Sequence, residues 1–71
     1  MSKYDWTNVP MEVQWIATDA IYSGAWGYTR KPILMSAYGT WAAKGTNNKL
    51  VGVVAQGYAG NWRDSLEERP K

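Results

Sequence analysis

The sequence predicts a mainly β fold, either a small antiparallel meander or an SH3-like, barrel-like sheet of four to five short strands, followed by a short C-terminal helix or tail. Runs rich in β-branched and aromatic residues, which are typical of strands, recur between turn-forming Gly, Pro and Asn residues. The 71 residues are enough for one domain only. We divide that domain into an irregular segment (1–12), a β core (13–60) and a C-terminal helix or tail (61–71).

The first half of the β core contains two predicted strands joined by a turn. Residues 13–19 (VQWIATD) form the first strand, and residues 20–24 (AIYSG) form a turn that reverses at its last two residues, Ser-Gly. Residues 25–30 (AWGYTR) form the second strand. The Lys31-Pro32 step then interrupts the ladder, because proline has no N–H to donate.

The second half of the core contains a bend, a turn and an apolar strand. Residues 33–38 form a third strand, Gly39 permits a bend, and residues 40–43 continue the strand beyond it. Residues 44–49 (KGTNNK) are the clearest turn, because Gly and Asn tolerate the left-handed conformation. Residues 50–55 (LVGVVA) form a short apolar strand, which we expect to be the most buried one.

A Gly-rich loop, residues 56–60 (QGYAG), leads to the C-terminal segment. There Asn61 is followed three residues later by Asp64, which is the pattern of a helix N-cap. We therefore expect a short helix over residues 62–68 that Pro70 stops. The alternative is an extended, charged tail, because so short a helix is marginal unless it docks.

Aromatic residues are the main resource for a stable core. The chain has five Trp and five Tyr but no Phe, Cys or His, which excludes disulfides and leaves only oxygen ligands for a metal. Stability must come from these rings or from self-association, so a homo-oligomer is expected. Each ring carries a polar N–H or O–H, which suits half-exposed rings at a binding surface. The alternative is a small core of Trp and Tyr whose tips reach the surface.

Charge is unevenly distributed along the chain. Residues 20–63 contain five cations and no acid, a formal charge of +5, whereas all six acids lie nearer the two ends. A surface of one sign attracts partners of the opposite sign. The alternative is that the terminal segments fold back and neutralise the centre.

The sequence offers little for catalysis. It has no His or Cys, and it has neither a Walker motif nor a dinucleotide-binding glycine motif. Asp19 is the only acid that ends a predicted strand, and we interpret it as a turn former. We therefore expect a binding protein that is not an enzyme and needs no cofactor.

Aromatic and cationic residues are interleaved along the chain. Trp26, Tyr28 and Arg30 share one face of the second strand, because side chains alternate along a strand. Rings stack on nucleobases and cations meet phosphate, so this composition is typical of a nucleotide or single-strand binder. A protein-binding patch favours the same residue types, and a long duplex is a less expected partner of scattered cations. The candidate ligand-binding residues are Trp26, Tyr28, Arg30, Tyr38, Trp41, Tyr58, Trp62 and Arg63.

Four segments resemble a group of short proteins encoded by tailed bacteriophages: DWTNVP (5–10), WIATD (15–19), a WGY…KP element (26–32) and NWRDSLEERP (61–70). The resemblance spans most of the chain and implies a phage origin and a role against the host that is exerted by binding. The turn departs from the group, in which it looks rich in Asp and Gly. Here Ile21 and Tyr22 occupy its tip, where we expect an exposed contact site.

Two functions follow as hypotheses. The first is a counter-defence protein, an oligomer that sequesters a small nucleotide-type signal in aromatic and basic pockets. The alternative is an inhibitor that binds a host defence or transcription factor through its aromatic face or an open sheet edge; a virion accessory protein is a third reading. The N-terminus lacks the apolar region of a signal peptide and no run is long enough to span a membrane, so we expect the protein in the host bacterial cytoplasm.

Overall fold

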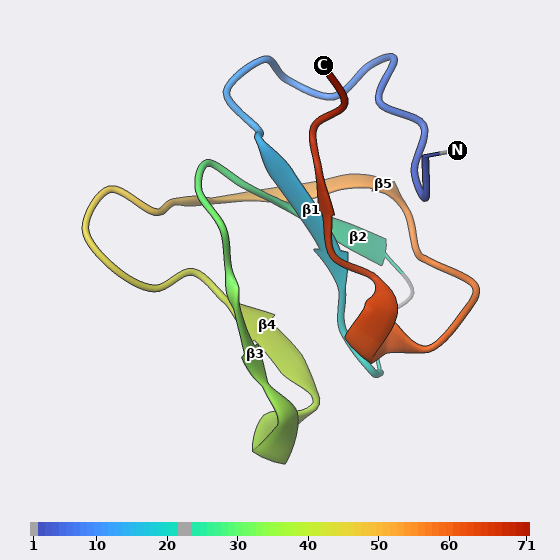
Figure 1. Cartoon of the computed structure of the whole chain (residues 1–71), viewed down its shortest axis with the longest axis vertical. Helices are drawn as coiled ribbons and strands as arrows, with labels where there is room; N and C mark the ends of the chain where they lie inside the picture. Colours follow the sequence, from blue (N-terminus) through green and yellow to red (C-terminus); the bar gives the residue numbers. More distant parts are fainter. Residues whose placement is uncertain (1, 22–23) are drawn as a thin grey trace.

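The computed structural model describes residues 2–21 and 24–71, and it has the mainly β fold that the sequence predicts (Figure 1). Tyr22 and Ser23 of the predicted turn lie outside the described residues. Their neighbour Ile21 is 78% exposed, as expected for the tip of a turn. Within the described ranges, no helix has the length and apolar character that crossing a membrane requires.

A four-stranded antiparallel sheet, with strand order β5-β2-β1-β6, forms the body of the molecule (Figure 1). Its strands are β1 (Trp15–Thr18), β2 (Gly24–Tyr28), β5 (Leu50–Gln56) and β6 (Glu67–Glu68). β1 and β2 form a hairpin in which Ala17 pairs with Trp26. β1 and β2 each have a neighbouring strand on both edges, and β1 is the more buried of the two, with three of its four residues buried.

A short hairpin of β3 (Ile33–Met35) and β4 (Thr40–Ala42) forms a second sheet. The prediction of one strand over residues 33–38 is wrong in its second half, because Ser36–Tyr38 form the 3-10 turn η1. Gly39 supplies the predicted bend with a φ of 70°, and its N–H donates to a carbonyl of η1. The chain therefore folds back and pairs with β3, instead of continuing the strand as predicted.

β5 is less buried than its apolar sequence predicts. Among the described strands it pairs with β2 alone and so lies at an edge of the sheet, and Leu50 and Val53 remain 49% and 59% exposed. Its pairing with β2 shifts register twice, and Gly52 has a φ of 133°, both of which are features of a bulged strand. An apolar run alone cannot distinguish an edge strand from a central one, and this is why the prediction of the most buried strand is wrong.

The C-terminal segment forms a 3-10 turn and a short strand where the sequence predicts a helix over residues 62–68. The predicted cap is confirmed, since the Asn61 side chain accepts a backbone N–H at the start of η2 (Trp62–Asp64). The turn goes no further because Ser65 is buried and its hydroxyl is hydrogen-bonded to Thr18 of β1. After Ser65 the chain is extended, and β6 pairs with β1.

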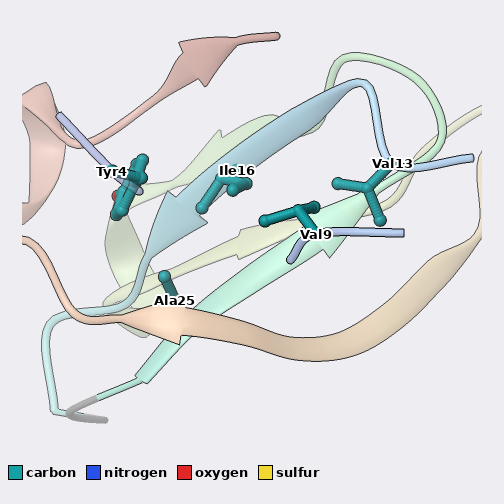
Figure 2. Close-up of a cluster of buried hydrophobic side chains, with 5 residues drawn as sticks. All are labelled: Tyr4, Val9, Val13, Ile16 and Ala25. Carbon is teal, nitrogen blue, oxygen red and sulfur yellow. The ribbon is translucent and has the colours of Figure 1, made fainter. Parts of the chain in front are cut away.

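Residues 2–12, the described part of the N-terminal segment, have no regular secondary structure, as predicted, yet they contribute to the core. The buried cluster in Figure 2 consists of Tyr4, Val9, Val13, Ile16 and Ala25. Two of these five side chains come from residues 2–12, and the others come from β1, β2 and the residues just before β1. The irregular segment is therefore an integral part of this small domain.

Candidate functional site

An open pocket of about 400 Å³ lies between the C-terminal end of β1 and the loop that joins β5 to η2. Residues 18–20 line one side, and residues of the loop line the other. Two aromatic residues, Tyr58 and Trp62, and one acid, Asp19, are among its lining residues. The volume is in the lower part of the range for small-molecule sites, roughly 300–1,000 Å³.

Tyr58, which lines one side of the pocket, is fixed by contacts of both its backbone and its ring. The backbone N–H of Tyr58 donates to the hydroxyl of Thr18 at 3.0 Å, and its ring lies 6.4 Å from the Tyr4 ring, centroid to centroid. A Cβ at Gly60 would lie only 2.7 Å from the Tyr58 ring, so the absence of a side chain at Gly60 lets the ring pack over the loop backbone. This wall is thus pre-organised before any ligand enters.

A buried hydrogen-bond network joins the same region to the sheet. The hydroxyl of Tyr4 donates to the Ser65 carbonyl at 2.7 Å and lies 2.9 Å from the Thr18 hydroxyl. The Ser65 hydroxyl accepts the Thr18 N–H at 2.9 Å, and its single proton lies within reach of two carbonyl oxygens, that of Trp62 at 2.6 Å and that of Thr18 at 3.1 Å. Burial raises the pKa of Tyr4, which keeps its hydroxyl protonated as a donor. Paired buried groups of this kind rigidify their surroundings.

Each aromatic wall carries a cation. The guanidinium of Arg63 lies 5.1 Å from the Trp62 ring centroid, and the ammonium of Lys3 lies 5.9 Å from the Tyr58 ring centroid. These distances are typical of cation–π contacts. Because Arg63 is exposed, its charge also faces solvent next to the pocket. Each of the two rings that line the pocket therefore has a cation against it, and neither cation is itself a lining residue.

Asp19 is buried at the edge of the pocket, with 8% of its surface exposed. One carboxylate oxygen accepts the backbone N–H of Trp41 at 2.8 Å, which fixes the side chain against β4. Within the described part of the chain, that is the only hydrogen bond of this carboxyl group. Desolvation raises the pKa of Asp19, and the Trp41 N–H offsets part of this effect.

The structure brings four of the eight candidate residues together around the pocket. Tyr58 and Trp62 line it, and Arg63 stacks on Trp62. Trp41 lies beside it, since its indole N–H donates to the Trp62 carbonyl at 3.2 Å. Tyr28 supports Trp41 from the core through a hydrogen bond of 3.3 Å to the Trp41 carbonyl.

The strand face predicted for Trp26, Tyr28 and Arg30 is not an exposed surface. Tyr28 is only 2% exposed, and this burial raises its pKa well above the ordinary range. Trp26 is half-buried on β2, and Arg30 is exposed beyond the end of that strand. Tyr38, on η1, is 73% exposed. Trp26, Arg30 and Tyr38 do not line the pocket.

The residues of the site that sequence reasoning misses include Asp19, Asn61 and Lys3. Asp19 was visible as the only acid at the end of a predicted strand, but its burial beside Trp41 depends on β4 folding back. The sequence predicts Asn61 as a cap only, and in the structure it also lines the pocket. Lys3 had no sequence signal at all, because only the fold places the N-terminal segment beside Tyr58.

The pocket thus combines two aromatic lining residues, a cation against each of their rings, and one largely buried carboxyl group. Across residues 2–21 and 24–71, no group of three or more His, Cys, Asp or Glu side chains is arranged to hold a metal ion. The Thr18 hydroxyl is already engaged with Tyr4 and with the N–H of Tyr58. Comparison with known proteins finds no matching family model, no similar curated protein and no similar solved structure.

Proposed function

We propose that this chain is a non-enzymatic binding protein that holds a nucleotide-type ligand in the pocket between β1 and the β5–η2 loop. The observation that carries the proposal is the pairing of each aromatic wall with a cation, Trp62 with Arg63 and Tyr58 with Lys3. A nucleotide needs both chemistries, since its base stacks on rings and its phosphate attracts cations. A pocket of about 400 Å³ suits a ligand of about one nucleotide.

The biological role that we propose is sequestration of a nucleotide signal during phage infection of a bacterium. The support for the phage origin is the resemblance of the terminal and strand segments to short phage proteins. The support for sequestration over turnover is the pocket chemistry, which supplies stacking and charge. A binder acting in this way captures its signal in the host cytoplasm.

Titration with a panel of nucleotides, including cyclic and ADP-ribose-derived ones, tests the proposal through the intrinsic tryptophan fluorescence and calorimetry. We expect Trp62→Ala to weaken binding by about 5- to 100-fold, because stacking is worth roughly 1–3 kcal/mol per base. The Trp62 carbonyl, which accepts the Trp41 and Ser65 hydrogen bonds, is retained in this variant. The absence of a heat or fluorescence change with every nucleotide would exclude the proposed function.

A charge-matched pair of variants separates the pocket cation from the overall charge. Arg63→Ala and Arg30→Ala each remove one exposed arginine, but only Arg63 stacks on a pocket ring. We expect Arg63→Ala to weaken binding and to reduce its salt dependence, whereas Arg30→Ala leaves both close to the wild-type values. Equal losses in the two variants would point to non-specific charge attraction.

A second candidate function is inhibition of a host defence or transcription factor through the free edge of β5. The seven residues of β5 carry no charge, and Leu50 and Val53 are exposed on it. The opposite edge is guarded, since β6 has only two residues, both glutamates, and Pro70 follows. An unguarded edge of this kind pairs with a strand from another protein.

A variant of β5 tests this second function. Val53→Lys places a charge on the edge strand, and we expect it to abolish capture of a host protein that wild-type protein retains from lysate. Unchanged capture would exclude β5 as the contact. A native mass spectrum showing dimers of the wild-type chain but monomers of Val53→Lys would instead assign the edge to the expected homo-oligomer.

A further inference from the structure

We infer that the ligand presents adjacent N–H donors to Asp19, as the base edge of a guanine nucleotide does, and that the pocket discriminates against adenine nucleotides. This inference rests on the proposed function and deepens it by naming the base. The observation behind it is a buried carboxyl group at the pocket wall that has one hydrogen bond, to Trp41, within the described part of the chain.

Asp19 is held in place by Trp41, which is itself fixed by two further hydrogen bonds. The backbone N–H of Trp41 donates to Asp19, the Trp41 carbonyl accepts the Tyr28 hydroxyl, and its indole donates to the Trp62 carbonyl. Three hydrogen bonds thus link the carboxyl group, β4, the core and the pocket wall. A carboxyl group fixed in this way presents its remaining acceptor capacity in a defined position.

The second carboxylate oxygen of Asp19 can accept a hydrogen bond from a donor on the ligand. An ionised carboxylate only accepts hydrogen bonds, and among the described residues the second oxygen of Asp19 is not one of the buried polar atoms that lack a partner, so it is accessible to a ligand. A guanine edge offers an N–H and an adjacent NH₂ group, which together match the two oxygens of a carboxylate. The adenine edge places a ring acceptor beside its NH₂ group, and that acceptor faces the carboxylate unfavourably.

The charges of the pocket also set the orientation of the ligand. Asp19 repels a phosphate, whereas Arg63 and Lys3 attract one from the aromatic walls. The base therefore lies towards β1 and β4, and the phosphate lies towards the cations outside the rings. The nucleobase end of the ligand contacts Asp19 and the phosphate end contacts the two cations, so the two interactions do not compete.

Binding of guanosine, inosine and adenosine monophosphates, measured by calorimetry, tests the inference on the wild-type protein. We expect the guanine nucleotide to bind roughly 10- to 100-fold more tightly than the adenine nucleotide, the discrimination typical of a matched bidentate contact. The inosine nucleotide keeps the ring N–H and lacks the amino group, so its affinity should lie between the two. Equal affinities for the guanine and adenine nucleotides would overturn the inference.

Asp19→Asn is the matching variant, because the amide oxygen still accepts the Trp41 N–H while the other position becomes a donor. We expect it to lose the guanine preference and to bind the adenine nucleotide as tightly as, or more tightly than, the wild-type protein does. Glu12→Gln removes the same charge from an exposed position outside the pocket and should change neither affinity.

The outcomes separate the two proposals. Nucleotide binding without base preference, or a guanine preference that persists in a folded Asp19→Asn variant, overturns the inference and leaves the proposed function standing. Binding of none of the three nucleotides, nor of any other in the panel, overturns both. If Asp19→Asn does not fold, the rank order of the three nucleotides on the wild-type protein still decides the inference.

Discussion

The indole N–H of Trp6 donates a hydrogen bond of 2.7 Å to the carboxylate of Glu67, and this contact joins the two ends of the chain. The other oxygen of the same carboxylate accepts the backbone N–H of Lys3 at 2.8 Å. The guanidinium of Arg69 lies 4.8 Å from the centroid of the Trp6 ring. The two terminal segments therefore contact each other, and their charged residues stabilise the fold.

Glu67→Ala is expected to lower the free energy of unfolding by about 1–3 kcal/mol, because it leaves a half-buried indole and a backbone N–H without their acceptor. Glu68→Ala is the matched control, since Glu68 is the exposed neighbour in the same two-residue strand. Its effect should stay within about 0.5 kcal/mol. Urea unfolding followed by circular dichroism measures both, and similar losses in the two variants would contradict the role of Glu67.

Arg69→Lys is expected to destabilise the protein although it conserves the charge. The Arg69 side chain donates to the Val13 carbonyl at 2.8 Å and to the Pro10 carbonyl at 2.7 Å, and a lysine cannot reproduce this forked geometry. We expect a loss of about 1–2 kcal/mol and faster amide exchange within residues 2–12. Lys71→Ala, at an exposed position two residues later, should change neither quantity. Unchanged exchange in Arg69→Lys would show that the N-terminal segment is held by other contacts.

Ser65→Ala is expected to cost about 1–3 kcal/mol of stability, because it removes the acceptor of the buried Thr18 N–H. The same change should weaken ligand binding, since Thr18 also positions Tyr58. Ser36→Ala, an exposed serine in η1, controls for the chemistry of the substitution. Thermal unfolding and nucleotide titration measure the two effects. Full stability in Ser65→Ala would show that the network contributes nothing to the fold.

Asp19 is expected to make stability fall as the pH rises from acid towards neutrality. Burial raises the pKa of Asp19 in the folded protein, so between its ordinary and its raised pKa the folded chain keeps a proton that the unfolded chain has released. The stability contributed by protonated Asp19 is fully present below the ordinary pKa and is lost through this interval. Asp19→Asn does not ionise and should escape this loss.

The difference in unfolding free energy between Asp19→Asn and the wild-type protein should therefore increase with pH, starting from its value at about pH 3. Urea unfolding at several pH values measures this difference, and the contributions of the other carboxyl groups largely cancel in it. A difference that is independent of pH would show that the pKa of Asp19 is the same in both states.

Several parts of the fold could be predicted because they depend on neighbouring residues. The strand of β1 follows from its β-branched and aromatic residues, and the cap of η2 follows from the side chain of Asn61. The bend at Gly39 follows from its tolerance of positive φ. The direction of the chain after that bend could not be predicted, because it depends on which strand β4 pairs with.

The candidate site was predictable only in part. Tyr58, Trp62 and Arg63 lie close together in the sequence, and a Gly-rich loop among aromatic residues is a local signal. The burial of Tyr28 and the half-burial of Trp26 could not be predicted from the sequence, because an aromatic residue on a strand suits a core face and a binding face equally well.

Local chemistry was sufficient to establish that this is a small, mainly β domain rich in rings and carrying an acid-free, basic central region. Those properties follow from composition and from the preferences of adjacent residues. Only the tertiary structure decided that β5 is an edge strand and that Asp19 lies beside the aromatic loop. It also decided that the two ends of the chain bind each other. These outcomes depend on contacts between residues far apart in the chain, and a local sequence pattern does not show which distant residues come into contact.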